Sequence, residues 1–140
     1  MPIGYPSATI LFIDAYEDAR QYHVQRLNMS SPDYVVLEAD TGAAGLSICK
    51  SLRIDCVVSE LDLPDMSGFQ VLADLVLRAR HPEIAVIILT RITIETFSEH
   101  ALKNGALAYL IKSHTSGDDL DKVIVKALAT VSYTRKEPRT

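Results

Sequence analysis

The sequence predicts one α/β domain built around a parallel β-sheet. Short apolar segments alternate with longer amphipathic segments, five of each, and this alternation is typical of a parallel sheet with helices on both faces. The chain has 140 residues, of which 48% are hydrophobic, so it is long and apolar enough to bury one core. We place the domain at residues 1–133 and a polar C-terminal linker or tail (TRKEPRT) at residues 134–140.

Five short apolar segments are the predicted strands. The first, residues 8–13 (ATILFI), is apolar without interruption, as expected for a parallel strand that is covered on both faces. Residues 84–89 (IAVIIL) form the most apolar segment of the chain. Residues 1–7, with two prolines and a glycine, are typical of a loose lead-in. The remaining strands are predicted at residues 34–39, 55–59 and 107–111.

Five amphipathic segments are the predicted helices, at residues 17–29, 41–52, 67–79, 94–104 and from 116 or 117 onward. Ser67 is the expected N-cap of the third helix, and Gly105 suits the position just after the fourth. Gly42 and Gly45 weaken the prediction of the second helix. The last helix has the clearest amphipathic pattern. The expected core contacts of the helices include Tyr22, Leu27, Leu46, Leu52, Leu72, Val76, Leu120 and Ile124.

Charge and composition exclude several classes of function. The chain carries 14 Lys and Arg residues against 18 Asp and Glu residues, and it lacks the basic stripe of a nucleic-acid-binding domain. Its apolar runs are far shorter than the ~20 residues that span a bilayer, and we expect no secretory signal because no charged-then-apolar pattern is found at residues 1–7. Cys49 and Cys56 have no zinc-site spacing and read as reduced thiols of a cytoplasmic protein. The four histidines also lack ligand spacing, and no Gly-rich phosphate loop is present.

Polar side chains follow four of the five predicted strands. Asp14, Glu60, Thr90 and Lys112 each stand where an apolar segment ends. One polar residue at a strand end is ordinary, but the carboxyl ends of parallel strands meet at one edge, where open α/β sheets bind their ligands. Four such residues with compatible chemistry therefore indicate a functional site at this edge.

Four segments around these positions resemble the receiver domain of bacterial response regulators, including the single-domain chemotaxis regulator. The resemblance covers about residues 8–132, and the segments that carry it are ILFIDAYEDAR, SELDLPDMSG, IILT and GALAYLIK. It implies a flavodoxin-like three-layer sandwich, with a five-stranded parallel sheet of order 2-1-3-4-5 and five helices. It also implies a two-component phosphorelay module rather than an enzyme, with a sensor histidine kinase or a fused output domain as partner.

The resemblance assigns roles to individual residues. A carboxylate at position 60 would accept a phosphoryl group from a phosphohistidine, while Mg²⁺ neutralises the phosphoryl oxygens. Lys112 would contact the phosphoryl group, and Thr90 would be the switch hydroxyl. Tyr109 would be the switch aromatic, which reports to the face formed by the fourth helix, fifth strand and fifth helix. The metal ligands would be Asp14, residue 60 and the backbone carbonyl of Asp62.

Two residues depart from the family pattern within the site. Glu60 stands in place of the phosphoacceptor aspartate, and its carboxylate lies about 1.5 Å further from the backbone. In-line phosphoryl transfer depends on positioning, and a misplacement of about 1 Å can lower its rate about 10²-fold. Ala15 stands in place of a second acid that binds Mg²⁺, so we expect weak or absent Mg²⁺ binding. Our hypothesis is a receiver that works without phosphorylation, in which Glu60 reaches toward Lys112 and Thr90.

Several alternatives stay open at this point. The domain could still be phosphorylated and switch an attached output domain, or it could be a constitutive interaction domain that pairs through the face named above, including as a homodimer. A flavodoxin-like small-molecule binder has only the fold in its favour. Arg91 could reach Glu60 or Asp62, or be solvated. The Lys112–Ser113 bond, where the family has a cis proline, could be trans with a shifted loop or a strained cis bond.

Overall fold

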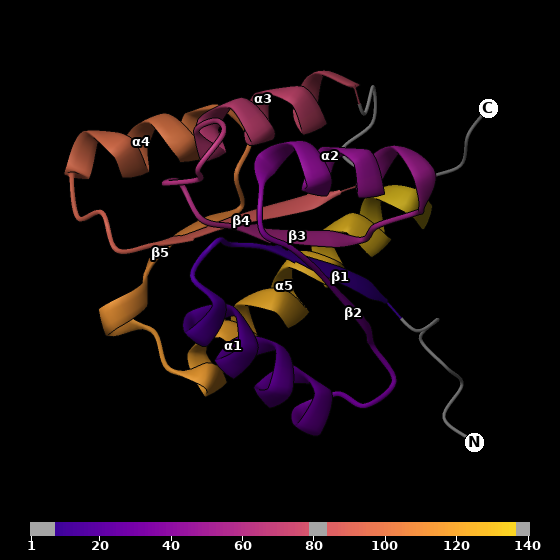
Figure 1. Ribbon diagram of the computed structural model, residues 1–140. Coiled ribbons are helices and arrows are strands. Elements are labelled where there is room, and N and C mark those ends of the chain that lie inside the picture. The colour runs from indigo at the N-terminus through magenta and orange to yellow at the C-terminus, as the bar shows by residue number, and fades with distance from the viewer. Residues whose placement is uncertain (1–7, 79–83, 137–140) are drawn as a thin grey trace.

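The sheet contains five parallel strands in the order β2-β1-β3-β4-β5, as predicted. The computed structural model describes residues 8–78 and 84–136 (Figure 1). The strands are β1 (Thr9–Ile13), β2 (Val35–Ala39), β3 (Cys56–Ser59), β4 (Ala85–Thr90) and β5 (Ala108–Ile111). The helices are α1 (Glu17–Ser30), α2 (Gly42–Ser51), α3 (Gly68–Arg78), α4 (Glu95–Lys103) and α5 (Gly117–Lys136), with a 3₁₀ turn, η1, at Lys112–His114.

Helices cover both faces of the sheet, which confirms the predicted three-layer sandwich. Figure 1 shows α1 and α5 on one face and α2, α3 and α4 on the other. Successive side chains of a strand point to opposite faces, so Ile10 and Phe12 of β1 pack on the α1/α5 side, while Leu11 and Ile13 pack on the other. The uninterrupted apolar runs of the sequence follow from this double coverage.

The helix ends agree with the predicted capping residues. The backbone N–H of Phe69 donates to Ser67 Oγ at 3.1 Å, and Gln70 Oε1 accepts in return from the Ser67 N–H at 3.1 Å, a reciprocal cap at the start of α3. Gly105, just beyond α4, has a φ of 110°, a conformation that side chains with a Cβ rarely adopt.

Three of the predicted helix contacts are wrong. Tyr22, Leu52 and Val76 are 54%, 54% and 42% exposed, because each lies at the margin of its helix's apolar face or just past its end. The two glycines of α2, which the sequence analysis took as weakening the helix, are its buried residues. A Cβ on Gly45 would lie 2.3 Å from Ile13 Cδ1, so the glycine permits close packing of α2 on β1.

The predicted tail begins as helix, since α5 continues to Lys136, three residues into the stretch 134–140. The predicted lead-in at residues 1–7, the connection around residue 82 and residues 137–140 lie outside the described residues. Among the described helices, none combines the length and apolar character needed to cross a bilayer.

Candidate functional site

The four predicted strand-end residues meet at one edge of the sheet. Asp14 and Glu60 directly follow β1 and β3, whose last residues, Ile13 and Ser59, are paired in register. Thr90 ends β4 and pairs with Ile111, the last residue of β5 and the neighbour of Lys112. Asp14, Glu60 and Thr90 are buried, with 6%, 2% and 0% of their surface exposed. The predicted convergence of these residues is confirmed.

Lys112 forms ion pairs with both carboxylates of the site. Its Nζ lies 2.7 Å from Asp14 Oδ2 and 2.8 Å from Glu60 Oε2. The side chains are 10%, 9% and 2% exposed for Lys112, Asp14 and Glu60, so water screens these pairs little. Among the described residues, neither Nζ nor Glu60 Oε2 has a hydrogen-bond partner beyond these ion pairs. One ammonium therefore balances two buried carboxylates.

The other oxygen of Glu60, Oε1, accepts three hydrogen bonds. The backbone N–H groups of Leu61 and Asp62 donate to it at 3.1 Å and 3.2 Å, and the hydroxyl of Thr90 donates to it as well. Hydrogen bonds to a carboxylate stabilise its charged form. Both oxygens of Glu60 are thus engaged by the protein itself.

A chain of hydrogen bonds leads from Glu60 to Tyr109. Thr90 Oγ1, which donates to Glu60, accepts from the N–H of Ile92 at 3.3 Å. The hydroxyl of Tyr109 donates to the carbonyl of Ile92 at 2.8 Å. Burial, followed by the nearby charge of Glu60, raises the pKa of Tyr109, so the phenol keeps its proton and its role as donor. The predicted switch threonine and switch aromatic are connected through the loop between β4 and α4.

The carboxylates present no free pair of oxygens for Mg²⁺. Asp14 Oδ1 accepts from the N–H of Tyr16 at 2.9 Å, while its Oδ2 faces Lys112. Within residues 8–78 and 84–136, no three acidic, His or Cys side chains are grouped so that they could hold a metal ion. Mg²⁺ requires near-octahedral oxygen ligands, and the ammonium of Lys112 lies between the two carboxylates available. This donor set does not fit the ion as it stands.

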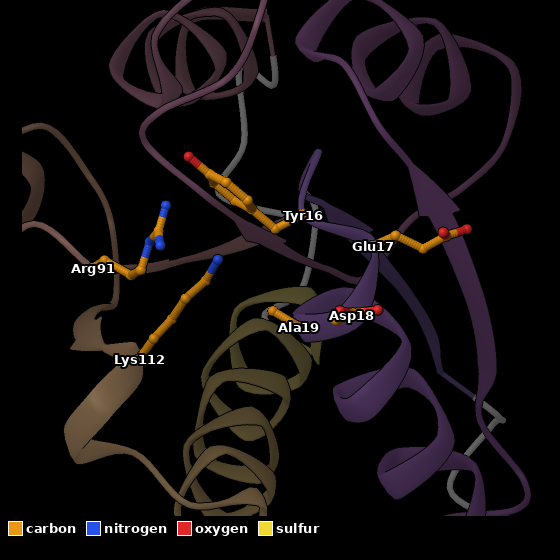
Figure 2. Close-up of a pocket in the computed structure, with 6 residues that line it drawn as sticks. All are labelled: Tyr16, Glu17, Asp18, Ala19, Arg91 and Lys112. Atoms are coloured by element: carbon orange, nitrogen blue, oxygen red, sulfur yellow. The ribbon is translucent and has the colours of Figure 1, made fainter.

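Tyr16 is a site residue that the sequence analysis missed. Its hydroxyl donates to Asp62 Oδ2 at 3.2 Å, and its ring lies 4.3 Å from the Arg91 guanidinium and 4.8 Å from Lys112 Nζ. Arg91 is exposed but stacks on this ring, an arrangement that was not foreseen. Figure 2 shows both cations reaching toward Tyr16. They border an open pocket of about 440 Å³, lined by Tyr16, Glu17, Asp18, Ala19, Arg91 and Lys112.

The loop after β3 is fixed to its surroundings at two points. The carboxylate of Asp65 accepts from the N–H groups of Gly42 and Ala43, each at 2.9 Å, and these bonds lower the pKa of Asp65. At Gly68, a Cβ would lie 2.5 Å from the carbonyl oxygen of Glu60, so α3 starts directly against the backbone of the site. These contacts position the loop that carries Glu60 and Asp62.

The loop after β5 contains the Lys112–Ser113 peptide bond, for which both a cis and a trans form were considered. No cis peptide bond occurs among the described residues, so this bond is trans. Lys112 begins the 3₁₀ turn η1, which ends at His114, and the hydroxyl of Thr115 donates to the carbonyl of Ile111 at 2.8 Å. The lysine thus reaches the carboxylates from a short turn.

Comparison with known proteins gives consistent matches over most of the chain. The response regulator receiver domain family matches residues 10–124. The nitrate/nitrite response regulator protein NarL of Escherichia coli is 32% identical over 122 residues, which cover 87% of this chain and 55% of that protein. The transcriptional regulatory protein DegU of Brevibacillus brevis is 26% identical over 119 residues, which cover 84% of this chain and 49% of that protein. The chain therefore spans about half the length of these curated relatives.

A solved structure agrees with these matches in both fold and sequence. The response regulator receiver domain protein of Clostridium thermocellum superposes with a TM-score of 0.81 and is 30% identical. The superposition covers 90% of this chain and 98% of that protein, so the match includes nearly the whole of a receiver domain.

Proposed function

Because this chain belongs to the response regulator receiver domain family, we propose that it is a signalling domain whose site is held by Glu60 instead of by a phosphoryl group. Receiver domains are signalling modules of two-component systems, and we expect no enzymatic turnover from this one. The observation that carries the proposal is the double engagement of Glu60, which pairs with Lys112 and accepts from Thr90. In a phosphorylated member of this family, a phosphoryl group would contact the residues equivalent to Lys112 and Thr90.

The chemistry of this substitution favours a state that is independent of phosphorylation. The longer side chain of Glu60 brings its carboxylate to Lys112 and Thr90 without an added group. A carboxylate imitates a phosphoryl group only in part, since the latter carries about −1.5 to −2 charges and three acceptor oxygens. The single ammonium of Lys112 is already shared between Asp14 and Glu60, so it is not free to bind the phosphoryl group of a phosphodonor.

Mg²⁺ binding should be weak or absent in this site. The ligands expected from the family are Asp14, residue 60 and the carbonyl of Asp62, while Ala15 offers no oxygen. The ion would have to displace the ammonium of Lys112 from two carboxylates at 2.7 Å and 2.8 Å. Titration with Mg²⁺, followed by the amide signals of Asp14 and Glu60, should give no saturation in the low millimolar range.

A second candidate function is a receiver that is still phosphorylated and switches an attached output domain. The observation in its favour is the similarity to relatives that are named as transcriptional or response regulators. A constitutive interaction domain is a third candidate. Apolar side chains are exposed on and beside α4, β5 and α5, at Ile94, Leu102, Leu107 and Val125, and this face could hold an output domain or a second copy.

Partners and location follow from this proposal. We expect a sensor histidine kinase or a fused output domain as partner, in the cytoplasm, and no binding of nucleic acid or membrane by this domain. The net charge of −4 disfavours binding to nucleic acid and to anionic membranes, because both are negatively charged.

Treatment with a small phosphodonor and Mg²⁺ tests the proposal. We expect no acid-labile phosphate on the native chain by intact mass spectrometry. The matched variant carries Glu60→Asp and Ala15→Asp, which restore both family residues, and it should gain label. Stoichiometric label on the native chain would overturn the proposal in favour of the phosphorylated alternative.

A further inference from the structure

The ion pair of the site is closed off from solvent although it lies at the edge of the sheet. Lys112 Nζ and Glu60 Oε2 are both buried atoms. The Tyr16 ring lies 4.8 Å from that ammonium, while Tyr16 itself is 37% exposed. One side of the residue therefore faces the ion pair and another faces water.

Tyr16 is fixed by contacts with three separate loops. It belongs to the loop between β1 and α1, where its N–H donates to Asp14 Oδ1 at 2.9 Å. Its hydroxyl bonds to Asp62 in the loop after β3, at 3.2 Å. The guanidinium of Arg91, in the loop after β4, stacks on the ring at 4.3 Å (Figure 2). Cations are attracted to the face of a tyrosine ring, so Arg91 and Lys112 both favour this position of the side chain.

We propose that Tyr16 is a cover that shields the Glu60–Lys112 ion pair from water, small anions and phosphodonors. This proposal rests on the proposed function, because the cover would be a second barrier to phosphorylation, in addition to the length of the Glu60 side chain. Arg91 directly follows Thr90, so the cover contacts the same segment that carries the switch hydroxyl.

The reactivity of the Lys112 amine toward acetic anhydride measures the cover directly. Acetylation at Lys112 is followed by peptide mass spectrometry at fixed pH and is normalised to the exposed Lys126. Tyr16→Ala should raise the normalised rate about tenfold, because the amine becomes accessible without local opening. Tyr16→Phe keeps the ring and both cation contacts, so its rate should stay within about threefold of the native rate.

Tyr22→Ala is the matched control, since Tyr22 is also an exposed tyrosine near the start of the chain, on α1, and should leave the rate unchanged. An unchanged rate in Tyr16→Ala would overturn the cover, because the ion pair alone would then shield the amine. An equal rise in Tyr22→Ala would overturn it as well, since the effect would not be specific to Tyr16. If Tyr16→Ala does not fold, Arg91→Ala should give a smaller rise, and no rise there counts against the cover.

The two proposals can fail separately. Phosphate on the native chain would overturn the proposed function and the exclusion of phosphodonors, whereas shielding of the Lys112 amine would still be decided by the acetylation rates alone. Equal Lys112 rates in the native chain and in Tyr16→Ala would overturn the cover and leave the phosphate result untouched.

Discussion

Lys112 carries the charge balance of the site, because its one ammonium faces two buried carboxylates at 2.7 Å and 2.8 Å. Removing one partner of a buried ion pair lowers the free energy of unfolding by more than the intact pair contributes to it, because the remaining charge stays desolvated without a partner. Here the remaining charges would be Asp14 and Glu60, which also repel each other. We therefore expect Lys112 to contribute to the stability of the folded chain.

Lys112→Met should lower the free energy of unfolding by about 3–5 kcal/mol at neutral pH, because it leaves two like charges buried without a cation. Urea unfolding followed by circular dichroism measures this loss. The control is Lys126→Met on the exposed face of α5, where we expect a change within about 0.5 kcal/mol. A loss below about 1 kcal/mol at Lys112 would mean that the carboxylates are not held as a buried charged pair.

Thr90→Val should cost about 1–3 kcal/mol in unfolding free energy, since it keeps the shape but removes the donor to Glu60 and the acceptor of the Ile92 N–H. Thr90→Ser, which keeps the hydroxyl, is the matched control and should retain the larger part of the stability. Equal losses in the two variants would contradict this prediction, because the methyl group of Thr90 would then matter as much as its hydrogen bonds.

At the scale of elements, the site depends on loops that are tied to neighbouring helices. The loop after β3 caps α2 through Asp65 and meets the start of α3 at Gly68. A helix N-terminus has unpaired N–H groups and a partial positive charge, so a carboxylate from another loop stabilises it. The position of Glu60 is therefore set partly by two helices that contribute no side chain to the ion pair.

Gly68→Ala should lower the unfolding free energy by about 1–3 kcal/mol, because its Cβ would meet backbone atoms of Glu60 and Leu61 that cannot move freely. Gly42→Ala is the control. The nearest atoms that its Cβ would meet all belong to the side chain of Met66, which is flexible and can shift. Thermal unfolding compares the two, and a larger loss for Gly42→Ala would contradict this explanation.

Asp65→Asn should change how stability depends on pH. The pKa of Asp65 in the folded state lies below its usual value of 3.8. The main cause is the hydrogen bond that its carboxylate accepts from the N–H of Ala43, followed by the one from the N–H of Gly42. A lowered pKa means that the ionised carboxylate contributes stability above pH 3.8 and loses it as pH falls through the folded-state pKa. The difference between native and variant, measured by urea unfolding, should be constant near neutrality and shrink in acid. A constant difference down to pH 2 would contradict the cap.

At the scale of the whole molecule, most of the architecture could be predicted because both faces of the sheet are covered. Double coverage makes the strands uninterrupted apolar runs, which are easy to find in a sequence. The helices that connect successive strands also make the strands parallel, so that Asp14, Glu60, Thr90 and Lys112 had to meet at one edge. The site could be predicted to the extent that it consists of strand ends.

The parts that could not be predicted depend on packing between segments distant in sequence. Tyr22 and Val76 fit a helical period but lie outside the buried stripe, because the period does not fix which margin of a helix faces the sheet. Gly45 is needed because of the side chain of Ile13 on another element. Tyr16 takes its place from Asp62 and Arg91 on two other loops, and only its position after Asp14 and Ala15 hinted at a role.

The carboxylate of Glu60 holds Thr90 and Tyr109 in place through hydrogen bonds, and NMR of Thr90, Ile92 and Tyr109 can measure this. We predict that Glu60→Ala shifts the signals of all three residues together, because their hydrogen-bond chain begins at Glu60 Oε1. We also predict that a small phosphodonor with Mg²⁺ leaves these signals of the native chain unchanged. Unchanged signals in Glu60→Ala, or shifted signals in the native chain with the phosphodonor, would show that Glu60 does not have this role.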